Sequence, residues 1–229
     1  MRLHRFYTTE NLEGRGEIKI FDEKLLHQLR DVFRLSAGSE IVFFDGRGTD
    51  YKFSVSILSK KEGVVEKISE EDVYVPEKKV TLLMSVIKKE NFELAVEKAT
   101  EIGVSEIVPI LSERTLQKNL NTERLQRIMI EASEQCGRGD VPTLGETVDL
   151  ETAFQKYSDI VAFDITGGDL ETVSKDVFAP KILIGPEGGW SEKELELLKE
   201  KSISIAKLGD TTLRAETAAI VSCAKVLHS

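Results

Sequence analysis

The stretch that decides the fold is residues 181–227, which read KILIGPEGGWSEKELELLKEKSISIAKLGDTTLRAETAAIVSCAKVL. Its opening run, 182–184, is short, continuous and apolar, as expected of a buried parallel strand. Gly185 and Pro186 then break the run and predict a loop at its end. Ser191 with Glu194 three residues later forms a capping box, so a helix is predicted to begin there.

The second half of this stretch repeats the same plan. An alternating run at 203–208 predicts another strand, and Gly209 with Asp210 ends it. Helical periodicity resumes at Ala215 and continues to Leu227. Because the carboxyl ends of parallel strands meet at one edge of a sheet, the two loops can share one ligand.

The first loop, 185–189, lacks the patterns that bind polyphosphates. It has neither the Lys of a phosphate-binding P-loop nor the three spaced glycines of a dinucleotide fingerprint. Its glycines admit close backbone approach, and Glu187 would repel phosphate, so a neutral ring edge or a cation suits it better. An ordinary strand-to-helix turn, with Glu187 beside a helix N-terminus, explains the same residues.

Residues 185–191 (GPEGGWS) and 208–218 (LGDTTLRAETA) together resemble the RsmE family of 16S ribosomal RNA uracil-N3 methyltransferases, in the SPOUT superfamily of S-adenosylmethionine enzymes. The resemblance continues through 95–115, 131–142, 29–51 and 3–7, and so covers nearly the whole chain. It implies a PUA-like, RNA-binding β-barrel at 1–72. It also implies a SPOUT-type methyltransferase domain at 73–229, an α/β fold with a mainly parallel sheet and a carboxyl-terminal trefoil knot. S-adenosylmethionine would be the cofactor, 16S ribosomal RNA or the small subunit the partner, and the protein a cytoplasmic homodimer joined through the carboxyl domain.

The resemblance also implies site residues. Arg214 and Glu216 would be catalytic. Cofactor contacts are expected at Asp164, Ile184, Gly185, Pro186, Glu187, Gly188, Leu208, Gly209, Leu213 and Thr217, and RNA contacts at Arg5, Arg30, Arg34 and Arg138. Because arginine stays charged, Arg214 would bind a phosphate or a developing anion and would not act as a base. Glu216 would act as a base or pair with Arg214.

The basic residues of the amino-terminal half have a simpler explanation. Arg30 and Arg34 lie near one face of a helix predicted after Asp22, whose apolar residues Leu25, Leu29, Val32 and Phe33 recur at helical spacing. Acidic side chains are interleaved with them, so this face can be an ordinary solvated surface. Phosphate binding would instead use the same arginines as its main source of affinity.

The rest of this half predicts a compact β-rich module. Asp45 and Gly46 mark a hairpin between β-branched and aromatic runs. The acidic stretch 69–79 is interpreted as a linker, after which alternating strands and helices predict a mainly parallel sheet.

Composition bounds the function. The chain has 229 residues and a net charge of −9, which argues against a protein that coats nucleic acid nonspecifically. Its two cysteines, Cys136 and Cys223, stand far apart, which indicates a reducing compartment and neither a disulfide framework nor a zinc site. No metal ligand set and no membrane span are expected.

Two other classes of function stay open from the residues alone. A noncatalytic RNA-binding assembly factor would use the same β-rich module, and a metabolic α/β enzyme would bind a small phosphorylated substrate at 185–189.

Overall fold

The computed structural model describes residues 3–115, 119–169 and 181–228. It divides into two compact units, the first made of Met1–Val75 and Ser133–Asp140 and the second of Pro76–Ala132 and Val141–Ser229. The predicted division at residue 72 differs from these units mainly at 133–140. This segment follows a helix that begins in the second unit, a return of the chain that no local sequence pattern signals.

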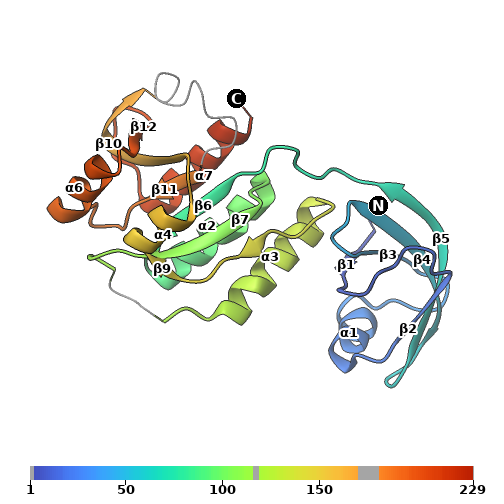
Figure 1. Ribbon diagram of the computed structural model, residues 1–229. Helices are drawn as coiled ribbons and strands as arrows, with labels where there is room; N and C mark the ends of the chain where they lie inside the picture. Colours follow the sequence, from blue (N-terminus) through green and yellow to red (C-terminus); the bar gives the residue numbers. More distant parts are fainter. Residues whose placement is uncertain (1–2, 116–118, 170–180, 229) are drawn as a thin grey trace. The chain divides into compact units, whose positions relative to one another are not determined.

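The first unit is a curled five-stranded sheet (Figure 1). Its strands are β1 (Arg5–Tyr7), β2 (Glu17–Ile20), β3 (Glu40–Phe44), β4 (Thr49–Leu58) and β5 (Gly63–Asp72), in the order β1-β3-β4-β5-β2. β3 and β4 pair antiparallel around Asp45 and Gly46, which confirms the predicted hairpin. Gly46 has φ 82°, a conformation that favours glycine.

The predicted amphipathic helix divides into α1 (Glu23–His27) and a π-helical turn, η1 (Gln28–Val32). Asp22 caps α1 by accepting a hydrogen bond of 2.8 Å from the backbone N–H of Leu25. Leu29 is buried as expected, but Val32 is 61% exposed. The wider π turn adds a residue before the next turn and rotates Val32 away from the core, so that part of the prediction was wrong.

The linker predicted from Ser69 begins later. β5 continues to Asp72, which pairs with Thr49 of β4. The acidic side chains of this strand end are exposed to solvent, so the segment has the polarity of a linker although its backbone is paired.

Arg5 is a buried connector within the first unit, at 8% exposure. Its guanidinium forms a bidentate pair with Asp50, at 2.6 and 2.8 Å. It also donates to the backbone carbonyls of Ser133, Glu134 and Arg138, and it lies 4.2 Å above the ring of Phe44. All five of its N–H groups are thus used inside the unit, which contradicts the predicted contact with RNA phosphate.

Replacing Arg5 with Met is therefore expected to destabilise the protein by about 3–5 kcal/mol, because Asp50 would remain buried without its cationic partner. Urea unfolding measures the change. Arg15→Met is the matched control: Arg15 forms an exposed pair with Glu10, whose side chains are 45% and 58% exposed, and its loss should change stability by less than about 1 kcal/mol. Equal effects of the two substitutions would show that the Arg5 cluster is not structural.

The second unit is built on a parallel sheet. Within the described residues its strands are β6 (Thr81–Ser85), β7 (Glu106–Leu111), β8 (Thr143–Leu144), β9 (Val148–Asp149), β10 (Ile160–Asp169), β11 (Lys181–Ile184) and β12 (Ser204–Lys207). The order is β12-β10-β11-β6-β7-β8, with β9 also on β7, and every pairing is parallel. The predicted mainly parallel α/β sheet is confirmed.

Helices cover both faces of this sheet (Figure 1). They are α2 (Lys89–Ile102), α3 (Thr122–Cys136), α4 (Leu150–Lys156), α6 (Glu192–Glu200) and α7 (Ala215–Leu227). Ile182 and Ile184 pack into a core shared with α2 and α7, whereas Leu183 packs into another shared with α4 and α6. Burial on both faces explains why the strand is continuously apolar.

The sequence at 169–178 has a helix-like pattern, but all of it except Asp169, the last residue of β10, lies outside the described residues. In the part of the chain that the structure describes, no helix is both long and apolar enough to cross a bilayer.

Candidate active site

A cavity of about 590 Å³ lies beside the middle of β10, at the carboxyl ends of β11 and β12. The three strands are neighbours and run in the same direction, so their carboxyl ends open on one edge of the sheet. Three stretches supply most of the wall: 163–165 within β10, 184–190 from the end of β11 into the following loop, and 208–218 before and within α7. Lys88 and Asn91, at the start of α2, complete it.

Most of the predicted cofactor residues line this cavity. They are Asp164, Ile184, Gly185, Pro186, Glu187, Leu208, Gly209 and Leu213. Gly188 and Thr217 do not belong to the lining. Gly188 faces Arg114, whose Nη1 donates to its carbonyl oxygen at 2.5 Å. Thr217 follows Glu216 in α7, and the helical rotation between successive residues turns its side chain from the wall.

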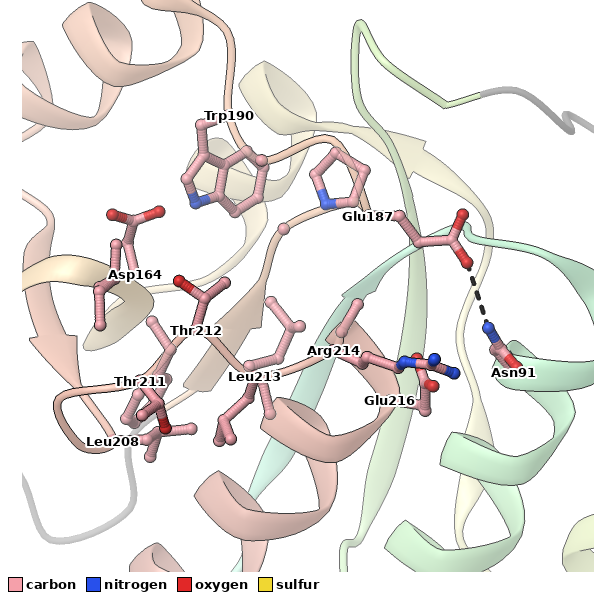
Figure 2. A pocket seen from close by; sticks show the side chains of 18 of the residues that line it. Asn91, Asp164, Glu187, Trp190, Leu208, Thr211, Thr212, Leu213, Arg214 and Glu216 are labelled. Carbon is pink, nitrogen blue, oxygen red and sulfur yellow. Dashed lines mark hydrogen bonds between the residues drawn. The ribbon is translucent and has the colours of Figure 1, made fainter.

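The loop after β11 is held from three sides. Glu187 accepts a hydrogen bond of 3.1 Å from the side-chain amide of Asn91 (Figure 2). The capping box is present: Ser191 accepts from the N–H of Glu194, and Glu194 accepts from the N–H of Ser191. The Glu194 carboxylate also accepts from the backbone N–H of Glu113 at 2.8 Å, which ties the loop to the end of β7. The cavity therefore has a fixed wall on this side.

Gly185 is required by its neighbour. A Cβ placed there would lie 2.9 Å from Cε2 of Trp190, closer than real Cβ contacts allow. The indole of Trp190 thus packs directly on the backbone at the end of β11, and it is 5% exposed.

Arg214 and Glu216 contribute one exposed cation and one buried carboxylate to the cavity wall. Arg214 is the N-cap residue of α7, and no ion pair joins it to another described residue. Glu216, in the first helical turn, is 7% exposed, and its Oε2 has no hydrogen-bond partner among the residues that the structure describes. A buried oxygen without a partner is destabilising, and it is a group to which a ligand can donate. In Figure 2, Arg214 and Glu216 lie at the right of the pocket, whereas Asp164 and Trp190 lie at the left.

The predicted RNA-binding arginines separate into two kinds. Arg138 is 3% exposed and donates from Nε to Asp140 at 2.8 Å, so, like Arg5, it lies in the interior of the first unit, contrary to the prediction. Arg30 and Arg34 remain near the surface. Arg30 forms an ion pair with Asp31. The pKa of the Asp31 carboxyl is lowered, mainly by the hydrogen bond from Arg30 and next by the one from His27. Arg34 has φ 54°, an uncommon conformation for a residue with a side chain.

Sequence reasoning missed several residues of the wall. They are Lys88, Asn91, Phe163, Ile165, Gly189, Trp190, Thr211, Thr212, Ala215 and Ala218. Thr211 and Thr212 lie inside a quoted motif, and Trp190 follows the glycines, so the motifs themselves held a signal. Asn91 gave no signal, because its contact spans 96 positions of sequence.

Comparison with known proteins identifies the class of protein to which this fold and site belong. A family model described as an RNA methyltransferase domain matches residues 75–227. A protein from Aquifex aeolicus named ribosomal RNA small subunit methyltransferase E is 32% identical, over 98% of this chain and 99% of that one. A protein of the same name from Rickettsia conorii is 26% identical, over 99% and 96% of the two chains.

Solved structures agree with the sequence comparison. The crystal structure of a ribosomal RNA small subunit methyltransferase E from Neisseria gonorrhoeae, bound to S-adenosyl methionine, superposes with a TM-score of 0.90 at 28% identity, covering 98% of this chain and 96% of that one. A predicted RNA methyltransferase from Thermotoga maritima gives a TM-score of 0.74 at 30% identity, covering 98% and 97%. The chain belongs to the ribosomal RNA small subunit methyltransferase E family.

Proposed function

We propose that this chain transfers a methyl group from S-adenosylmethionine to N3 of a uridine in 16S ribosomal RNA. The observation that carries the proposal is the cavity beside three parallel strands, where the exposed Arg214 shares a wall with a buried carboxylate, Glu216, whose Oε2 has no partner among the described residues. Membership of the family supplies the cofactor and the class of RNA. The uridine N3 position follows from the resemblance of 185–191 and 208–218.

The cavity fits the cofactor in size and in character. Its volume of about 590 Å³ lies within the usual range for small-molecule sites, roughly 300–1,000 Å³. Phe163, Ile184, Leu208 and Leu213 give apolar walls for an adenosine ring. Asp164 offers a carboxylate to ribose hydroxyls or to the ammonium group. The bound cofactor would supply an electrophilic methyl group on a sulfonium.

The protein's own residues would handle the proton and the charge. Uracil N3 is a poor nucleophile while it carries its proton, so a base or an anion stabiliser is required. Oε2 of Glu216 would accept the N3 proton as the new N–C bond forms and the S–C bond breaks. Arg214 would face the negative charge that develops on the ring, or a neighbouring phosphate.

Titration calorimetry with S-adenosylmethionine, followed by methylation of 16S RNA and of the small subunit, tests this function. N3 methylation blocks base pairing, so a new stop in reverse transcription would locate the product. Cofactor binding without methylation of either substrate would favour the noncatalytic assembly factor. Failure to bind the cofactor would refute the proposal that the chain is an S-adenosylmethionine-dependent methyltransferase.

Gly185→Val is expected to abolish measurable cofactor binding, because the added side chain would displace the indole of Trp190 toward the cavity. Calorimetry compares it with the parent. Gly16→Ala in the first unit serves as the control, since a Cβ there meets nothing within 4 Å. A folded Gly185→Val protein with parental affinity would place the cofactor elsewhere.

The first unit would bind RNA through the surface of α1 and η1. Changing Arg30 and Arg34 together to Glu should weaken RNA binding and flatten its dependence on salt, while cofactor affinity stays constant. Glutamate at residue 34 keeps a side chain in the left-handed conformation, so backbone preference changes little. Arg15→Glu with Lys19→Glu gives the same change in charge at exposed sites of the same unit. Equal salt slopes for both double variants would remove Arg30 and Arg34 from the interface.

The remaining family features are also proposals. We infer a PUA-like barrel for the curled sheet, a trefoil knot in the carboxyl domain, a homodimer joined through that domain and a cytoplasmic location. The resemblance of 185–191 and 208–218 supports these features.

A further inference from the structure

The indole of Trp190 carries a polar group that the fold does not use. Trp190 is 5% exposed and packs in the core of Leu183 and Leu198. Its Nε1 is buried and has no hydrogen-bond partner among the described residues. Buried indole N–H groups usually find an acceptor, so this donor needs an explanation.

The unused donor lies at the wall of the cavity. Trp190 is one of the lining residues, and the nitrogen-bearing edge of its ring rests on Gly185, where a Cβ would be 3.2 Å from Nε1. Figure 2 shows the nitrogen on the side of the indole that faces Asp164. The packing on Gly185 fixes the ring, so the donor direction is preorganised.

The nearest carboxylate drawn beside the indole is engaged in its own turn. Oδ1 of Asp164 accepts hydrogen bonds from the backbone N–H and the hydroxyl of Thr166, at 3.0 and 2.7 Å. These bonds hold Asp164 in place, whereas Nε1 of Trp190 has no partner in the part of the chain that the structure describes. An acceptor supplied by a ligand resolves the unpaired donor.

We propose that Trp190 donates a hydrogen bond from Nε1 to the adenosine half of the bound cofactor and so helps to position it. The inference rests on the proposed function. Adenosine offers neutral acceptors on its ring nitrogens and ribose oxygens, and the apolar walls of Ile184 and Leu208 suit its ring. The carboxylate of the methionine half is better matched to a cation than to a neutral N–H donor.

The test removes one N–H group and keeps the ring. Trp190 is the only tryptophan of the chain, so a tryptophan auxotroph can replace it alone with β-(3-benzothienyl)alanine, which has sulfur in place of N–H. Calorimetry then measures the affinity of the protein for S-adenosylhomocysteine and for 5′-methylthioadenosine, which lacks the amino-acid half. Both affinities are expected to fall about tenfold, the value of one hydrogen bond.

The outcomes separate this inference from the proposed function. Unchanged affinity for S-adenosylhomocysteine in the substituted protein would overturn the hydrogen bond while leaving the methyltransferase intact. A lower affinity for S-adenosylhomocysteine together with an unchanged affinity for 5′-methylthioadenosine would overturn the assignment of the hydrogen bond to the adenosine half. A parent protein that binds neither probe would refute the proposed function itself. Should the benzothienyl protein fail to fold, Trp190→Phe, which also lacks the donor, is expected to show the same loss of both affinities, and parental affinity would overturn the inference.

Discussion

Replacing Glu216 with Gln is expected to slow methyl transfer by at least about 100-fold, the lower end of what a positioned general base contributes. The substitution keeps the shape of the side chain and removes its capacity to take a proton. Affinity for S-adenosylmethionine should stay within about threefold of the parent, because the proposed partner of Oε2 is the RNA base. Single-turnover methylation with saturating cofactor measures the chemical step.

RNA that carries 5-fluorouridine distinguishes a base from a structural carboxylate. Fluorine makes the N3 proton more acidic, so an enzyme without its base should recover part of its rate on the fluorinated substrate. Glu196→Gln, at an exposed position of α6, is the control and should behave as the parent. A Glu216→Gln enzyme that is equally slow on both substrates would exclude proton transfer as the role of Glu216.

The sequence predicted the parts of this site that local chemistry determines. A continuous apolar run, a glycine break and a capping box follow from side-chain volume and backbone hydrogen bonding within a few residues, and β11, its loop and α6 appear where these signals place them. Parallel strands share a carboxyl edge, so two loops on such strands had to open on the same side. The position of β10 between β11 and β12 could not be read from the pattern, yet it adds Asp164 to the wall.

Burial of charge was the feature that sequence could not assign. Arg5 and Arg30 are both basic residues near strands or helices of the same unit, but Arg5 meets Asp50 across 45 positions of sequence, whereas Arg30 meets its neighbour Asp31. A pattern of charges does not specify such distant pairing. The same limit applies to Asn91 and Glu187, whose contact depends on how α2 and the loop after β11 meet in the folded unit.

Arg214→Ala is expected to reduce methyl transfer by at least about 100-fold, the amount lost when one electrostatic stabiliser of a transition state is removed. Arg214 precedes α7 and its side chain is exposed at the cavity, so its removal takes little from the core. The melting temperature should therefore stay within a few degrees of the parent. Lys should replace Arg214 poorly, since a point charge lacks the planar fork that grips a phosphate or an anion.

Separate measurements of methyl transfer and of thermal stability decide whether Arg214 is catalytic or structural. Cofactor binding by calorimetry should be close to parental, because the adenosine site is expected beside Trp190. Arg127→Ala removes one exposed arginine of the same unit, outside the cavity wall, and should retain parental turnover. Near-normal methylation by Arg214→Ala on both naked RNA and the small subunit would end the catalytic proposal. A large fall in melting temperature would instead identify Arg214 as a residue that holds the start of α7, because loss of a positive charge at a helix N-terminus would by itself stabilise the helix.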